Sequence, residues 1–208
     1  MSLVLFMTGA WGCCFAMDLP RLATEKELTR SLKFPEGEIV MKGKSYWVEN
    51  GTIFRLIQGI RFRPRCRDPE MEQILPRIVL CGLFSKNSTR VNERMLPVLA
   101  RLGHALKWGA LQDYEIHISA PSNETVLKDV DISFMHLRTE WIRDYLVQKW
   151  DIASWRISVA GELEQEESEL LDGPNKKVDN EGCVLIVAVG TKGQSFLQAC
   201  EQDPRERH

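Results

Sequence analysis

Residues 134–161 read FMHLRTEWIRDYLVQKWDIASWRISVAG, and this stretch combines two patterns that decide the fold. Its first half repeats apolar side chains at helical spacing, namely Phe134, Leu137, Trp141, Ile142, Tyr145 and Leu146. Spacings of three and four residues place these side chains on one face of a helix, which we expect to span 132–149. The second half, 156–161, has the short apolar run of a strand. A helix followed closely by a strand is typical of a layered domain that mixes both elements.

The alternation of helical and strand-like patterns continues on both sides of this stretch. Strands are predicted at 77–84, 114–118, 156–161 and 183–189. A helical pattern occupies 91–107, and we expect Pro97 in the first turn of that helix. The order of elements over residues 75–190 is therefore β-α-β-α-β-β. It predicts a fold of the α+β class, a mixed four-stranded sheet with helices on one face.

Residues 17–74 have a different pattern and predict a small β-rich N-terminal region. A short helix is expected at 23–32, followed by strands at 39–41, 45–48 and 52–57. Asn50-Gly51 lies between the last two strands and favours the tight turn of a β-hairpin. Arginine then recurs at Arg55, Arg61, Arg63, Arg65 and Arg67. These residues fit either a solvated edge strand, protected by its charges from further pairing, or an anion-binding strip.

The chain begins with an uncharged apolar run at residues 3–17. The run is shorter than the roughly 20 residues that a membrane-spanning helix needs, and it ends in the small side chain of Ala16. We expect residues 1–16 to be a signal peptide or N-terminal anchor; lipidation at Cys13 and a buried first strand are the alternatives. The polar stretch 191–208 is expected to be a tail.

Composition and motifs limit the class of function. With 27 Lys+Arg against 29 Asp+Glu, the net charge of −2 gives no basic field, so nucleic acid is not an expected partner. The sequence has no serine elbow, no metal-ligand spacing and no glycine-rich phosphate loop. Its four histidines are scattered along the chain, at His104, His117, His136 and His208. We expect a protein that is not an enzyme and uses no cofactor and no metal.

Six cysteines occur without a C-x-x-C pair, at Cys13, Cys14, Cys66, Cys81, Cys183 and Cys200. If the first two leave with a signal peptide, the remaining four allow three pairings in an oxidising compartment. The alternative is that Cys81 and Cys183, each in an apolar strand-like run, are simply buried as small hydrophobic side chains.

The order of elements and two local strings resemble the OmpA-like family, which includes the OmpA C-terminal domain, MotB and Pal. The string 134–146 is similar to that family's L-S-x-x-R-A-x-x-V-x-x-Y-L, and 152–161 is similar to its I-x-x-x-R-I-x-x-x-G. Both stand in the family's order, and the resemblance covers residues 75–190. It implies an exported protein of the bacterial envelope, periplasmic or associated with the outer membrane. Peptidoglycan and other envelope proteins are the implied partners, with membrane contact only through an uncleaved or lipidated N-terminus.

The resemblance also implies a binding site. The family binds peptidoglycan non-covalently by holding a diamino acid of the stem peptide between an aspartate and an arginine. The aspartate pairs with the ammonium group of the diamino acid and the arginine with its carboxylate. Arg138 falls on the family's arginine, Asn123 on its aspartate, and Asp131 on the asparagine before the helix. Asn180, before the last strand, fits the pattern as well. Because Asn123 carries no charge, the alternative function is a domain that keeps the fold and serves only protein-protein contacts.

Overall fold

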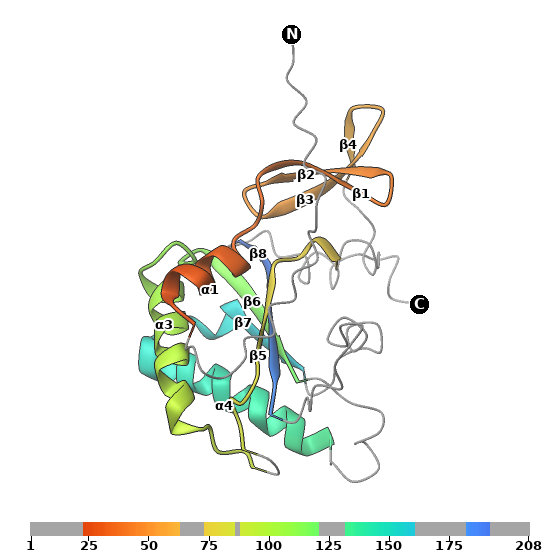
Figure 1. Cartoon of the computed structure of the whole chain (residues 1–208). Helices are drawn as coiled ribbons and strands as arrows, with labels where there is room; N and C mark the ends of the chain where they lie inside the picture. Colours follow the sequence, from red (N-terminus) through yellow and green to blue (C-terminus); the bar gives the residue numbers. More distant parts are fainter. Residues whose placement is uncertain (1–22, 63–72, 86–87, 121–131, 161–181, 192–208) are drawn as a thin grey trace.

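The computed structural model describes residues 23–62, 73–85, 88–120, 132–160 and 182–191 (Figure 1). They form two four-stranded sheets, an N-terminal one of order β1-β2-β3-β4 and a C-terminal one of order β5-β8-β6-β7. Within this part of the chain, no helix has the length and apolar character that crossing a membrane requires.

The C-terminal sheet is mixed. Its strands are β5 (Arg77–Leu80), β6 (Tyr114–Ser119), β7 (Ile157–Ala160) and β8 (Val184–Thr191). Strand β8 is antiparallel to both β5 and β6, whereas β6 and β7 are parallel. The helices α1 (Glu25–Leu32), α3 (Leu96–Lys107) and α4 (Ile132–Trp150) lie on one side of this sheet (Figure 1). The predicted α+β class, with its βαβαββ order and helices on one face, is confirmed.

The N-terminal sheet is an antiparallel meander. Its strands are β1 (Gly37–Met41), β2 (Lys44–Glu49), β3 (Thr52–Ile57) and β4 (Ile60–Phe62). Asn50 and Gly51 form the turn between β2 and β3, with φ values of 51° and 75°. Two left-handed residues in a two-residue turn match the twist of the flanking strands, so the predicted hairpin is confirmed. Strand β4, which contains Arg61, is an edge strand, and this fits the interpretation of the arginine-rich segment as a solvated edge strand.

Two predicted element boundaries differ from the structure by more than two residues. The strand predicted at 77–84 ends at Leu80, since Gly82 has a φ of 72° and turns the chain. The helix predicted from residue 91 begins only at Leu96, after a 3-10 turn (Glu93–Met95) whose first residues are capped by the side chain of Asn92. Pro97 lies in the first turn of α3 as predicted, where a backbone N–H has no helical partner to lose.

One hydrophobic cluster extends from the helices through the C-terminal sheet into the N-terminal sheet. Leu28 and Leu32 of α1 are fully buried, and so are Tyr46 and Val48 of β2. At the end of β8, the Thr191 hydroxyl donates to the carbonyl of Asn50 at 2.6 Å. The β2–β3 turn is thereby attached to the C-terminal sheet.

A capping box fixes the start of α1. The backbone N–H of Glu27 donates to Thr24 Oγ1 at 3.3 Å, and the N–H of Thr24 donates to Glu27 Oε2 at 2.8 Å. Two backbone donors that the first helical turn cannot satisfy are paired in this way. Because α1 packs on α3 and β5, it belongs to the helical layer of the C-terminal sheet.

Candidate functional site

Arg138 is a buried cation in α4, with 6% of its surface exposed. Its Nε donates to the carbonyl of Ser88 at 2.9 Å, and its Nη2 donates to the carbonyl of Ser85 at 3.1 Å. The guanidinium carbon lies 5.2 Å from the centre of the Phe84 ring, a cation–π contact. The connection between β5 and α3 therefore holds the guanidinium in a fixed orientation.

The helix periodicity brings Arg138 to this connection. Ile142 and Leu146, one and two helical turns further along α4, are fully buried in the core. Arg138 shares their face and is carried inward with them. A buried guanidinium is costly unless its N–H groups are paired, and the carbonyls of Ser85 and Ser88 supply partners.

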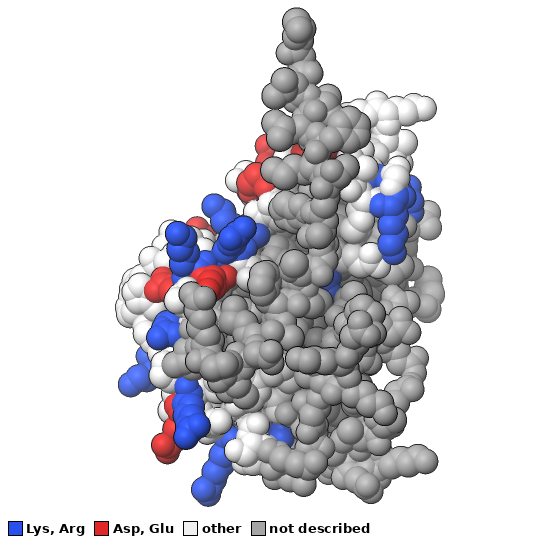
Figure 2. Space-filling model, viewed as in Figure 1, with Lys and Arg blue, Asp and Glu red and all other residues white. Residues whose placement is uncertain are grey.

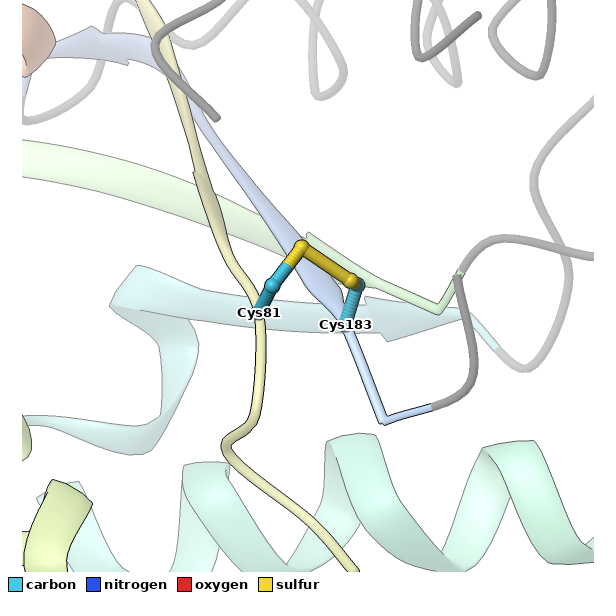
Figure 3. Close-up of a disulfide and its surroundings, with 2 residues drawn as sticks. All are labelled: Cys81 and Cys183. Carbon is cyan, nitrogen blue, oxygen red and sulfur yellow. A yellow bond between two sulfur atoms is a disulfide. The ribbon is translucent and has the colours of Figure 1, made fainter. Parts of the chain in front are cut away.

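A disulfide ties the β5 end of this connection to the start of β8. Cys81 and Cys183 are bonded to each other (Figure 3). Cys81 directly follows Leu80 and Cys183 directly precedes Val184, and Leu80 and Val184 are the last pair of the antiparallel ladder between β5 and β8. The interpretation of both cysteines as merely buried hydrophobic side chains is wrong, because the pairing of β5 with β8 places their sulfur atoms side by side.

Beyond the disulfide, the backbones of the two segments come into close contact. The N–H of Phe84 donates to the carbonyl of Gly182 at 3.3 Å. A Cβ atom at Gly182 would overlap the carbonyl oxygen of Phe84, and Gly182 has a φ of 83°, so a side chain is excluded there on two grounds. Phe84, which contacts the guanidinium of Arg138, is thus itself held by the segment that leads into β8.

Of the four predicted ligand-binding residues, Arg138 lies within the described part of the chain. Asn123, Asp131 and Asn180 lie outside the described residues. The predicted grip of a zwitterion between Asn123 and Arg138 therefore stays a prediction.

Arg156 is a second buried arginine, which the sequence analysis did not single out. Its guanidinium donates to the carbonyls of Leu106 at 3.0 Å, Leu111 at 2.9 Å and Tyr114 at 2.7 and 3.0 Å. Burial lowers the pKa of Arg156, an effect that the nearby carboxylates of Asp113 and Glu115 oppose. The arginine in the string 152–161 is the signal that could have revealed this role in closing the α3–β6 connection.

The three histidines that the structure describes each have their own polar neighbour. His104 Nδ1 lies 3.0 Å from Glu25 Oε1, and His117 Nδ1 lies 2.9 Å from Ser158 Oγ. His136 Nε2 lies 3.5 Å from Glu140 Oε1 in the same helix. Burial lowers the pKa of His117, which favours its neutral form. Among the described residues, no group of three or more His, Cys, Asp or Glu side chains could hold a metal ion.

The arrangement around Arg138 suits the recognition of an anion. An arginine side chain keeps its charge in proteins, and its planar fork of N–H groups matches a carboxylate. Because Ser85 and Ser88 orient the guanidinium in advance, little conformational entropy is left to lose when a ligand binds.

No family model matches the sequence, and no curated protein matches it. Solved structures similar to this chain include the cell wall anchor of the T6SS from Pseudomonas aeruginosa, with 15% identity, a TM-score of 0.41, and coverage of 56% of this chain and 81% of that chain. The periplasmic domain of Helicobacter pylori MotB has 12% identity and a TM-score of 0.41, with coverage of 83% and 99%. Another periplasmic domain of MotB has 12% identity and a TM-score of 0.42, with coverage of 91% and 98%.

Proposed function

We propose that this chain is an exported protein of the bacterial cell envelope whose α+β domain binds peptidoglycan non-covalently through Arg138. The observation that carries the proposal is the oriented guanidinium, at the position where the OmpA-like resemblance places the ligand arginine. The carboxylate of a stem-peptide diamino acid can meet such a guanidinium in a planar geometry. Asn123, Asp131 and Asn180 complete the proposed site, whose role is binding and not catalysis.

The disulfide supports the proposed compartment. Disulfides form and persist in oxidising compartments such as the bacterial periplasm and are rare in the cytosol. The bond between Cys81 and Cys183 therefore fits an exported protein, as does the apolar run at residues 3–17. We place the chain in the periplasm, with association to the outer membrane as the finer proposal.

A second candidate function is a domain that keeps the fold and serves only contacts with other envelope proteins. The burial of Arg138 favours it, because a guanidinium that is 6% exposed and bonded to backbone carbonyls can have a purely structural role. The two candidates differ in whether the chain binds the cell wall at all.

The test is co-sedimentation of the chain with purified sacculi. Wild type is expected to sediment with them, and Arg138→Ala to bind about tenfold or more weakly, as expected for losing a charge-assisted hydrogen bond. Arg143→Ala is the matched control, because Arg143 lies in the same helix but pairs with Glu140 and Asp144 on the outer face. Arg143→Ala should bind as wild type does.

A competition assay tests whether binding to sacculi depends on the stem peptide. Soluble muropeptides that contain diaminopimelate should release wild type from sacculi, whereas the same glycan without stem peptides should not. Absence of wild-type binding would leave the protein-contact function. Equal binding by wild type and by a folded Arg138→Ala variant would remove Arg138 from the site.

A further inference from the structure

Exposed apolar side chains are concentrated on the N-terminal sheet. Seven large hydrophobic residues are exposed in the described part of the chain, and four of them, Val40, Ile57, Ile60 and Phe62, belong to this small sheet. Val40 is 68% exposed and Ile60 is 59% exposed. A cluster of this kind on a small element marks a contact surface, whereas single exposed hydrophobic residues are ordinary.

All four side chains lie toward one end of the sheet. In an antiparallel meander alternate turns share an end, so the β1–β2 turn at Lys42-Gly43 lies beside the β3–β4 turn at Gln58-Gly59. The β2–β3 turn lies at the opposite end, where Thr191 binds Asn50. We call residues 40–44 and 57–62 the tip. Figure 1 shows the β3–β4 hairpin of the tip pointing away from the C-terminal sheet.

The strand register places apolar side chains on both faces of the tip. Ile57 is paired with Ile60, and Phe62 follows two residues later on the same face. Val40 is paired with Ser45, which is paired with Leu56, so Val40 lies on the other face. A protein partner usually covers one face of a sheet. A lipid bilayer, in contrast, surrounds an inserted tip from both sides.

The charge on the tip is positive. Lys42 and Lys44 lie in and beside the β1–β2 turn, whereas the acidic residues of this sheet, Glu38 and Glu49, lie toward the opposite end. Arg61 reaches back to Glu49, with an Nη1–Oε2 distance of 2.6 Å. Figure 2 shows Lys and Arg side chains beside uncharged surface at the upper right, where Figure 1 places the turns of the tip.

We propose that the tip binds the surface of an anionic phospholipid bilayer. Val40, Ile57, Ile60 and Phe62 enter the region between headgroups and acyl chains, and the exposed Lys42 meets the lipid phosphates. The sequence predicted membrane contact only through the N-terminus. This second contact goes beyond peptidoglycan binding, because it places the N-terminal sheet on a membrane while the C-terminal domain is available to the cell wall.

The first test is sedimentation of the full chain with vesicles of equimolar phosphatidylglycerol and phosphatidylethanolamine. The double variant Ile60→Ser/Phe62→Ser should bind about tenfold or more weakly because it loses apolar burial in the bilayer. The variant Lys42→Gln should bind about fivefold more weakly, and high salt should reduce the wild-type binding. Vesicles of phosphatidylcholine should bind the chain less than the anionic vesicles do.

Trp155→Ser is the matched control, because Trp155 is 49% exposed but lies in a 3-10 turn before β7, outside the tip. It should bind vesicles as wild type does. All variants share residues 3–17, so a difference between them reports on the tip. These substitutions lie outside the Arg138 site, so sacculus binding should be unchanged, and either proposal can fail while the other stands.

Amide hydrogen exchange provides the second test. Anionic vesicles should slow exchange at residues 57–62 in wild type and should not do so in the double variant. Unchanged exchange with vesicles would overturn the proposal. So would protection that rises with protein concentration in the absence of lipid, since that result would identify the tip as a contact between two copies of the chain.

Discussion

At the scale of single residues, two buried arginines connect distant segments through backbone carbonyls. Arg156 donates to carbonyls of the segment from α3 to β6 and closes it. Arg138 donates to Ser85 and Ser88, in the connection between β5 and α3. Both residues occupy arginine positions of the family strings, yet the structure gives Arg156 a role inside the fold, whereas Arg138 carries the proposed ligand contact.

Arg156→Met should lower the free energy of unfolding by about 3 kcal/mol or more, because it leaves several buried carbonyls without a donor. The measurement is urea unfolding followed by circular dichroism. Arg143→Met, a change at a partly exposed position of α4, should stay within about 0.5 kcal/mol of wild type. Equal effects of the two variants would contradict the structural role of Arg156.

Asn123→Asp should strengthen the binding of muropeptides that contain meso-diaminopimelate by about tenfold or more, because a charged acceptor forms a hydrogen bond to an ammonium roughly twice as strong as a neutral one does. Titration calorimetry on the full chain measures the change. Arg138→Ala, added to Asn123→Asp, should abolish the gain. A gain that persists without Arg138 would place the ligand elsewhere.

At the scale of elements, the packing of α3 on α4 depends on the absence of a side chain. Gly103 of α3 faces Trp150 of α4, and a Cβ atom at Gly103 would overlap the indole ring. Trp150 in turn meets Trp108 edge-on, with ring centres 5.7 Å apart. The two helices therefore approach closely at the C-terminal end of α4.

Gly103→Ala should destabilise the protein by about 1–3 kcal/mol through overpacking, although the same change at an open helix position would stabilise it by about 1 kcal/mol. A double-mutant cycle tests the cause. In a Trp150→Ala background the substitution should become neutral or stabilising, because the ring that it would meet is gone. Thermal unfolding of the four proteins gives the result, and an unchanged penalty in that background would count against the contact.

At the scale of the whole molecule, the disulfide joins segments far apart in the chain. Cys81 and Cys183 are separated by 102 residues, and the loop they close contains α3, β6, α4 and β7. Closing so long a loop restricts the unfolded chain considerably. The bond also lies next to the connection that orients Arg138.

Reduction should therefore lower the free energy of unfolding by about 2–5 kcal/mol. The experiment compares urea unfolding with and without a thiol reductant. The variant Cys81→Ala/Cys183→Ala should not respond to the reductant, which controls for the other cysteines. If this variant responds as strongly as wild type does, the stabilising bond lies elsewhere.

The proposed compartment is tested on protein isolated from its native host. The mature chain is expected to begin near Met17 and to fractionate with the envelope, because residues 1–16 have the apolar character of an export signal. Mass spectrometry of the N-terminal peptide provides the measurement. An intact Met1 on protein from the cytosolic fraction would contradict export.

The sequence by itself determined those features that depend on neighbouring residues. The apolar spacing of 134–146 predicts α4, the alternation of Tyr114 to Ile118 predicts β6, and Asn50-Gly51 predicts the hairpin. Within the helical pattern, Leu137 is an exception, because it is 51% exposed and does not lie on the buried face. These elements, placed in order, already implied the α+β class.

Only the tertiary structure decided which segments, far apart in the chain, lie next to each other. The order β5-β8-β6-β7 places Cys81 next to Cys183, and the position of α4 brings Arg138 to Ser85 and Ser88. The sequence could propose Arg138 as a binding cation but could not name the carbonyls that hold it. Every residue type carries the same backbone carbonyl, so the sequence does not indicate which carbonyls accept these hydrogen bonds. Strand pairing joins segments that are far apart in the chain, and a periodicity of neighbouring residues does not indicate which strands will pair.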